Sequence, residues 1–291
     1  MAVLTGFGGH ISRGTVGGGG EAHIGCVRQW GISEVASAVE ARCSASKRGT
    51  IRAAGNKDWT GQYQAYGGTP EVLPGELFEF EGAITGDGAA AIGAKGNSIC
   101  DNVSIEWNYE TGAIISHTVA FGANGALTKG TVTCPEDDTI PDPKPATGCK
   151  IERAVDPFTS FTEIAGVRTA KLTLSKSNKA YVVSDSAGIT KRSAGPFDAQ
   201  VEMAILADAA TGFNIYPALN TVLALRLYID STTFWLLKWM QVLGISGENV
   251  DIEGGDLVGG SLSFGMCGIT KVSTVPTVGA IITPAVVTIW P

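Results

Sequence analysis

Apolar and polar residues alternate along many short segments of the chain. Phe78 and Phe80 alternate with Glu79 and Glu81. The same period of two recurs in three further segments, residues 103–108, 201–205 and 223–230. Because successive side chains of a β-strand point to opposite faces, this period predicts strands with one buried face. Turn residues such as Gly, Asn and Asp separate the segments. The pattern therefore predicts a mainly β fold.

Helical periodicity is scarce. Residues 33–42 and residues 204–210 could each form a short helix, although either segment could equally be a strand. We expect a short helix or two in each half of the chain.

A segment rich in proline and acidic residues lies between Cys134 and Cys149. Proline removes a backbone donor, so this composition disfavours both helix and ladder and predicts a linker. This linker separates two halves of similar length. We predict five parts in all: an N-terminal Gly-rich arm (1–20), a first module (21–134), the linker (135–148), a second module (149–270) and a β-branched tail (271–291).

The two modules resemble each other. Residues 112–125 align with residues 255–268, so that Gly112 matches Gly255 and Phe121 matches Phe264. Further matches fall earlier in the modules: Gly55 with Gly195, Asp58 with Asp198, Phe78 with Leu223, and Phe80 with Leu225. The matched positions are 140 to 145 residues apart, and these small changes of spacing predict loop insertions. We interpret the chain as two copies of one β-rich module.

Composition and charge exclude several classes of function. The chain has 291 residues, of which 44% are hydrophobic and 17% are charged, and this excludes intrinsic disorder. The formal net charge of −7 disfavours tight binding to nucleic acid. The apolar runs 219–229 and 279–290 are shorter than the ~20 residues that a bilayer requires. We expect no membrane partner, no export signal and reduced cysteines.

The usual chemical signatures are missing from the sequence. Three scattered histidines lack the spacing of a metal cluster, and the glycine run at residues 17–20 lacks the Lys-Ser/Thr of a phosphate loop. No Gly-x-Ser-x-Gly elbow is present either. We expect no metal site, no cofactor and no nucleophilic catalysis, and we predict that the chain is not an enzyme.

Paired carboxylates leave one enzymatic alternative open. Glu79 and Glu81 lie two residues apart, as do Asp251 and Glu253, so each pair would project from one strand face. A glycosidase uses two such groups, and a carbohydrate-active protein could use Asp251 or Glu253. A solvated outer face of a strand gives the same pattern.

Basic residues concentrate in one Ser/Gly/Ala-rich span: Arg42, Lys47, Arg48, Arg52 and Lys57. This span could be a contact arm that reaches an acidic surface, or simply a solvated loop. We favour the arm, since long ordered loops tend to carry function.

Three segments carry a resemblance to a known family: residues 55–67 (GNKDWTGQYQAYG), 72–80 (VLPGELFEF) and 107–121 (WNYETGAIISHTVAF). They resemble the tail tube (major tail) proteins of long-tailed bacteriophages. The positions that define the first module are Gly55, Asp58, Trp59, Pro74, Gly75, Gly112 and Phe121. A more diverged copy, over residues 167–268, has Gly195, Asp198, Gly255 and Phe264 at matching positions.

The resemblance implies two tandem tail-tube-type modules, each a β-sandwich or half-barrel. In this family the inner sheets close into a β-barrel around a lumen, and stacked rings form a conduit for DNA and for the tape-measure protein. Single-module members form hexameric rings, so a duplicated chain would form a trimer with pseudo-sixfold symmetry. The implied location is the virion tail, assembled in the host cytoplasm, with tail terminator and tail-tip proteins as partners at the ends.

The resemblance also suggests roles for charged residues. A lumen lined by carboxylates would let a polyanion slide, and Glu79, Glu81, Asp251 and Glu253 are the candidates. The span from Arg42 to Lys57 would bridge to an acidic patch on the adjacent ring. The tail after Lys271 could add a strand to a neighbouring module or close its own domain.

One rival class fits the same β-rich pattern without tubes. A tail terminator, a capsid decoration protein or an adhesin module would use duplicated β-units to bind a partner.

Overall fold

A computed structural model describes residues 9–17, 21–41, 51–85, 88–134, 143–155, 158–184, 187–206, 217–249, 259–267, 278–282 and 288–289. The fold is mainly β, as the sequence predicts, and no α-helix occurs within these ranges. The two segments that could have been helices are strands where they are described, in β3 (Val27–Ala41) and at the end of β13 (Phe197–Leu206). Pairing with neighbouring strands satisfies their backbone groups and overrides the weak helical pattern.

Within the ranges just given, the first half of the chain contains seven antiparallel strands. They pair in the order β2-β1-β5-β6-β7-β4-β3. Besides β3, these strands are β1 (His10–Gly14), β2 (Ala22–His23), β4 (Ile51–Tyr66), β5 (Leu77–Thr85), β6 (Gly88–Asn108) and β7 (Ser116–Cys134). β1 lies within residues 1–20, and its pairing with β5 makes it part of the sheet.

Strands of the second half pair in the matching order β9-β8-β14-β15-β16-β13-β10. They are β8 (Ile151–Val155), β9 (Thr162–Glu163), β10 (Val167–Lys176), β14 (Val222–Tyr228), β15 (Phe234–Asn249) and β16 (Gly259–Met266), with β13. The described part of this half also contains four short strands: β11 (Lys179–Tyr181) and β12 (Lys191–Ser193), which form a hairpin, and β17 (Val278–Ile282) with β18 (Thr288–Ile289).

The match between the halves extends to the register of the strands. Gly61 lies opposite Phe121 where β4 pairs with β7, and Val201 lies opposite Phe264 where β13 pairs with β16. Phe121 and Phe264 are the phenylalanines that the sequence alignment matches. The same side-chain face is therefore buried at the same point of both halves.

Local irregularities also recur. The ladder of β6 and β7 shifts register after Cys100, and the ladder of β15 and β16 shifts after Val242. The turn before β5 closes with a hydrogen bond from the Gly75 N–H to the Cys100 carbonyl, and the turn before β14 with one from the Asn220 N–H to the Val242 carbonyl. Gly75 and Asn220 have φ angles of 85° and 65°. Glycine and asparagine are the residues that most readily adopt this left-handed conformation.

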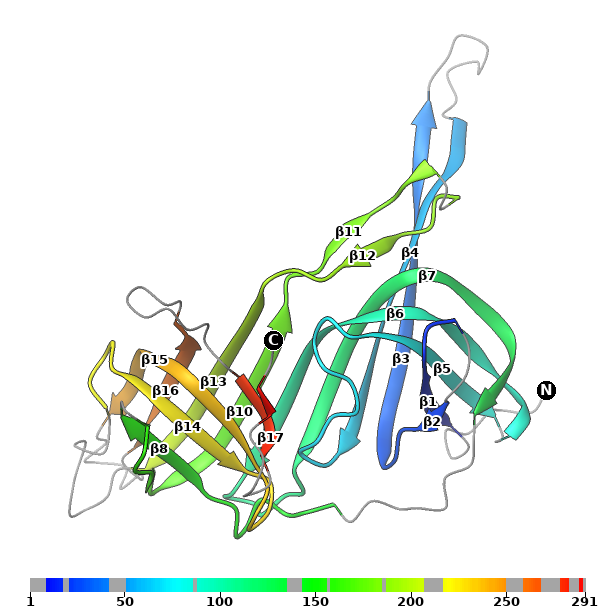
Figure 1. The fold of residues 1–291 in the computed structure, drawn as a ribbon. Helices are drawn as coiled ribbons and strands as arrows, with labels where there is room; N and C mark the ends of the chain where they lie inside the picture. Colours follow the sequence, from blue (N-terminus) through cyan, green and yellow to red (C-terminus); the bar gives the residue numbers. More distant parts are fainter. Residues whose placement is uncertain are drawn as a thin grey trace.

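β6 and β10 join the two halves. They pair from Asn102 opposite Ser175 to Asn108 opposite Thr169. The result is a continuous run of eight antiparallel strands in the order β3-β4-β7-β6-β10-β13-β16-β15, and Figure 1 shows the two halves side by side on either side of this joint.

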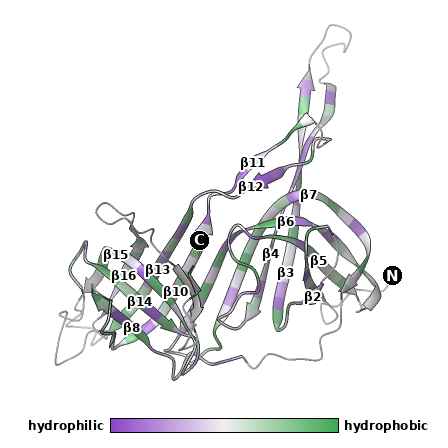
Figure 2. Ribbon diagram, in the orientation of Figure 1, coloured by the Kyte–Doolittle hydropathy of each residue, from purple (hydrophilic) through white to green (hydrophobic). Residues whose placement is uncertain are grey.

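One hydrophobic core spans both halves beneath this joint. The Trp107 indole N–H, from the first half, donates to the Tyr228 carbonyl at 2.9 Å, and the Trp235 indole N–H, from the second, donates to the Gly68 carbonyl at 2.9 Å. Figure 2 shows hydrophobic and hydrophilic residues alternating along the strands that cover the core. Two buried indoles satisfied across the joint indicate a packed interface between the halves.

The C-terminal tail adds a strand to its own chain where it is described. β17 pairs with the beginning of β15, with Ile282 opposite Phe234 and Val278 opposite Leu237. In the first half, the long strand β7 runs beside almost all of β6, whereas β16 is shorter and leaves this part of β15 uncovered. β17 pairs with this part of β15 instead. Of the two predicted roles, adding a strand to a neighbouring module or closing its own domain, the described tail strands therefore have the second.

Candidate functional site

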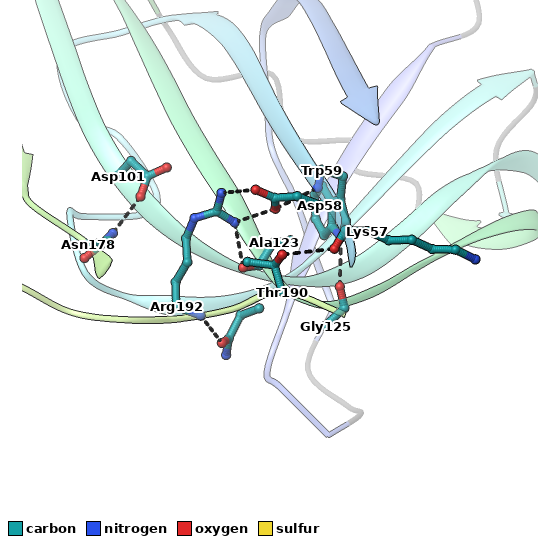
Figure 3. Close-up of polar contacts among 10 residues, drawn as sticks. Lys57, Asp58, Trp59, Asp101, Ala123, Gly125, Asn178, Thr190 and Arg192 are labelled. Carbon is teal, nitrogen blue, oxygen red and sulfur yellow. Dashed lines mark hydrogen bonds and ion pairs between the residues drawn. The ribbon is translucent and has the colours of Figure 1, made fainter. Parts of the chain in front are cut away.

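A hairpin from the second half reaches over the first half, and its central contact is an ion pair. Figure 3 shows Arg192, on β12, and Asp58, on β4. Arg192 Nη1 donates to Asp58 Oδ1 at 3.0 Å and Nη2 donates to Asp58 Oδ2 at 2.8 Å, which makes the pair bidentate. Arg192 Nη1 also donates to the Ala123 carbonyl at 2.8 Å. The guanidinium therefore links β12 to both β4 and β7.

The surrounding backbone is shaped for this contact. Gly122 lies directly under the guanidinium, and a Cβ at this position would collide with it. The Lys57 N–H donates to the Gly188 carbonyl at 2.7 Å, and the Thr190 N–H donates to the Lys57 carbonyl at 3.0 Å. The hairpin is thus held by main-chain bonds as well as by charge.

A second polar contact fixes the start of the same hairpin. Asn178 Nδ2 donates to Asp101 Oδ1 at 2.7 Å and to the Cys100 carbonyl at 2.9 Å. Burial raises the pKa of the Asp101 carboxyl, and the Asn178 hydrogen bond opposes this shift. Asp101 is the extra residue at the bulge of β6, so the bulge supplies the acceptor.

The face of the eight-stranded run that points away from the core is polar. Its residues are small or neutral for the most part: Thr60, Gln62, Asn102, Ser104, Thr118, Thr169, Thr173, Gln200, Ser246, Ser261 and Ser263. A depression of about 660 Å³ crosses β6, β10, β13, β15 and β16, and another of about 420 Å³ crosses β3, β4, β6 and β7. The hollowed polar face thus extends over both halves.

Charge on this face is sparse and mostly paired. Lys171 Nζ lies 3.0 Å from Glu106 Oε1, across the joint between β10 and β6. Glu202 is exposed on β13. Arg192 at one end of the face is bound to Asp58, and the Arg28 guanidinium lies over the Tyr66 ring, 5.0 Å from its centroid. The face therefore has little capacity to grip an anion.

Both ends of the eight-stranded run have open edges. Within the described ranges β3 pairs only with β4, and residues 244–249 of β15 pair only with β16. Large apolar side chains are exposed beside these edges: Val35 at 65%, Val39 at 61% and Leu243 at 58%. An edge that combines free backbone groups with exposed apolar side chains is suited to pairing with another chain.

Comparison with known proteins adds no assignment. The chain matches no protein-family model and no curated protein sequence. Nor do the described residues include a helix of the length and apolarity needed to span a bilayer. The geometry above is therefore the basis for a functional proposal.

Glu79 and Glu81, the predicted lumen carboxylates that the structure describes, do not lie on the open polar face. Glu79 and Glu81 belong to β5, which is outside the eight-stranded run. Glu81 is only 1% exposed, because the end of β7 packs against it and the Thr133 N–H donates to Glu81 Oε1 at 2.6 Å. Its prediction as a solvated residue is wrong. Asp251 and Glu253 lie outside the described residues.

The environment of Glu81 is acidic as well as buried. Carboxylate oxygens of Glu21, Glu79 and Glu81 lie within 4.8 Å of one another. Burial raises the pKa of the Glu81 carboxyl; the Thr133 hydrogen bond opposes this, and the charge of Glu21 adds to the rise. Glu79 Oε1 lies 4.0 Å from Lys95 Nζ.

Two of the predicted arm residues are described. Arg52 lies on β4, and its Nε donates to Glu40 Oε1 at 2.6 Å in an exposed pair. Lys57 takes part through its backbone in the hairpin contact above. The other three predicted arm residues, Arg42, Lys47 and Arg48, lie outside the described residues.

The glycines of the aligned motifs serve close packing. Gly55 lies against the carbonyl of Ser37, and Gly195 lies against the carbonyl of Ser177, so that a Cβ at either position would clash. Gly112 has a positive φ of 63°. Glycine is the residue that tolerates both situations.

Other residues of the motifs are structural where described. The Trp59 indole N–H donates to the Gly125 carbonyl at 2.9 Å, and Pro74 is buried beside the turn at Gly75. Phe121 and Phe264 are buried in the core, and Asp198 accepts a hydrogen bond from Gln200 Nε2 at 3.0 Å. Gly255 lies outside the described residues.

Sequence reasoning missed Arg192, although a signal was present. The pattern I-x-R followed by I-x-x-V-R occurs in residues 11–28 and again in residues 151–168. These segments are 140 residues apart, the same spacing as Gly55 and Gly195, so the alignment extends back to β1 and β2. At this spacing Arg192 matches Arg52 of the first half.

Proposed function

We propose that this chain is the subunit of a phage-type tail tube, a structural protein that self-assembles into stacked rings around a conduit for DNA. One observation carries the proposal. The eight-stranded antiparallel run has a hollowed polar face and ends in two open edges, β3 and residues 244–249 of β15. Pairing these edges between copies would remove both from solvent and close the sheet into a barrel.

The chemistry of the open face supports a conduit. Nonspecific DNA binding depends on Lys and Arg contacts to phosphate. On the described part of this face Lys171 is paired with Glu106, Arg192 is paired with Asp58, and the remaining positions are mainly Ser, Thr, Asn and Gln. Such a wall would be wetted by water without holding a polyanion. No enzymatic role and no cofactor is part of the proposal.

The matching pairing order of the halves supports a ring of three chains. Each chain would contribute two equivalent four-stranded units, so three chains would supply six units and 3 × 8 = 24 strands. With strands ~4.8 Å apart and tilted by ~40°, such a barrel would be about 48 Å across between backbones. Barrels of 16 to 18 strands already leave an aqueous channel, so this one would be open.

Electron microscopy of the purified full-length chain tests the proposal. We expect rings or tubes with an open channel, and class averages with three chains and six similar lobes. Particles without a channel would favour another β-rich virion or surface protein, such as a tail terminator, a capsid decoration protein or an adhesin module. A chain that stays monomeric at every concentration tested would overturn the proposal.

A further inference from the structure

The pairing of β6 with β10, which joins the two halves inside the chain, is a pattern that the two open edges can repeat between chains. In the joint, β10 lies antiparallel to the last part of β6, with Thr173 opposite Ser104. β3 has in the first half the place that β10 has in the second, because each is the last strand of its pairing order. Likewise, residues 244–249 of β15 follow a bulge as residues 102–108 of β6 do.

We propose that β3 of one copy adds to residues 244–249 of β15 on a second copy of this chain, antiparallel, with Ser33 opposite Ser246. The inference rests on the proposed function, since it names the interface between neighbouring subunits and its register. Copying the internal joint position by position places Glu34 opposite Ile245 and Val35 opposite Gly244.

Apolar exposure at the two edges agrees with this pairing. Leu243 is the extra residue at the bulge of β15, as Asp101 is at the bulge of β6. Asp101 contacts Asn178, which directly follows Ser177, the residue that lies against Gly195. In the first half, Ser37 lies against Gly55 in the same way, so Ala38 has the position that matches Asn178. The polar contact inside the chain would thus become an apolar contact between copies, with the exposed Leu243 beside Ala38 and Val35. Burial of these side chains favours association.

A charged contact repeats as well. Arg52 lies three residues before Gly55, as Arg192 lies three residues before Gly195. Asp198 lies opposite Ser175 on β10, as Asp58 lies opposite Val35 on β3.

In the single chain, Arg52 forms an exposed pair with Glu40, and Asp198 contacts the amide of Gln200. Between copies, Arg52 would bind Asp198 of the neighbour as Arg192 binds Asp58. The position that matches Gly122, beneath the guanidinium, is also a glycine, Gly265. In the single chain the Leu243 side chain lies over Gly265, so it would move aside when the guanidinium binds there.

The difference between the two joints would make assembly specific. The internal joint has a partly buried polar contact and a well-shielded arginine, whereas the outer edges offer exposed apolar groups with one arginine and one aspartate. Opposite charges at fixed places set the register and orientation of two surfaces. β3 of one copy would therefore select β15 of the next.

Charge reversal tests the contact. Arg52→Asp and Asp198→Arg are each expected to raise the concentration needed for assembly at least tenfold, and the double variant R52D/D198R is expected to restore assembly. The control is Arg13→Asp on β1, away from both edges, which removes a partly exposed pair with Glu76 and should assemble like the native chain. Light scattering and electron microscopy measure assembly; circular dichroism confirms that each variant is folded.

A second measurement tests the register. In the double variant S33C/S246C, opposed Cα atoms at the spacing of an antiparallel pair would permit a disulfide. Mild oxidation should give a ladder of cross-linked chains on a non-reducing gel. S33C alone and S246C alone report any cross-linking through the native cysteines.

The outcomes separate the interface from the function. Native rings or tubes together with unchanged assembly of both charge-reversal variants would overturn the proposed interface and leave the tube intact. Cross-linked ladders from particles without a channel would support the interface and overturn the tube. Cross-linking no greater than in the single-cysteine variants would overturn the register.

Discussion

The two halves of the chain have the same strand order but differ in the chemistry at matching positions. In the first half Ser12 on β1 lies opposite Glu81 on β5; in the second, Glu152 on β8 lies opposite Arg226 on β14. Lys150 Nζ lies 2.6 Å from Glu152 Oε1, and the Tyr228 hydroxyl donates to Glu152 Oε2 at 3.0 Å. Strand order is thus compatible with either arrangement of polar groups, provided that each is satisfied.

The cores differ in the same way. The first half is built around a cluster of aromatic rings in tilted and edge-on contact, with the centroids of Phe80 and Phe121 4.9 Å apart. In the second half Leu223 and Leu225 take the places of Phe78 and Phe80. Register and alternation are retained while side-chain type changes, which shows that the pattern of burial matters more here than residue identity.

The largest effects are expected at the matched phenylalanines. Phe121→Ala and Phe264→Ala should each reduce the free energy of unfolding by about 3–5 kcal/mol, because each removes a fully buried ring from the core. Denaturant unfolding below the assembly concentration measures the loss. A cost under about 1 kcal/mol at Phe264 would break the equivalence, since no Phe→Ala change in a packed core is that mild.

Next in size is the contact between the halves. Arg192→Ala removes a bidentate pair and should cost about 1–3 kcal/mol, the range for hydrogen bonds of charged groups. The matched control is Arg52→Ala, whose exposed pair with Glu40 should contribute less than about 1 kcal/mol in the unassembled chain. A double-mutant cycle with Asp58→Ala isolates the pair. Equal effects at Arg192 and Arg52 would contradict the predicted difference.

A pH-dependent difference is expected at Glu152. Burial acts to raise the pKa of this carboxyl, but the hydrogen bonds from Lys150 and Tyr228 outweigh it and hold the pKa below its usual value. Stability from Glu152 is therefore present at neutral pH and lost as the pH falls below the ordinary range for glutamate.

Glu152→Gln should cost about 1–3 kcal/mol near pH 7 and progressively less in acid. Unfolding of both proteins between pH 3 and pH 7 measures it, with Glu202→Gln, on the exposed face of β13, as the control. A cost that persists unchanged at pH 3 would show that the charge of Glu152 is not involved.

The opposite sign is expected at Glu81, and the effect is the smallest. Burial raises the pKa of Glu81, so its ionised form opposes folding once the pH exceeds the folded pKa. Glu81→Gln keeps an oxygen for the Thr133 N–H and removes the charge. It should raise the melting temperature at pH 7, with little change well below pH 4. A lower melting temperature at pH 7 would reverse this difference between the halves.

The mainly β class and the matched phenylalanines were predictable because alternation and turn residues are local signals. Glu81 shows the limit of such local signals. Its alternation with Phe80 predicts a solvated side chain, yet the end of β7, with Thr133 52 residues further along the chain, packs over it. Arg192 lies 134 residues from Asp58, and no local pattern reports so distant a pair. The identity of the open polar face required the order of the strands, which alternation alone does not supply.

β6 serves both halves at once, pairing with β5 along its first part and with β10 along its last. In a strand, a shift of one residue turns every later side chain to the opposite side. One residue inserted between Asn102 and Asn108 would therefore either turn the later side chains of β6 to the opposite face or require a second bulge beside the one at Asp101. Because β7 and β10 both pair within residues 102–108, the length of this span is constrained from two sides, whereas a surface loop of the molecule has no such constraint.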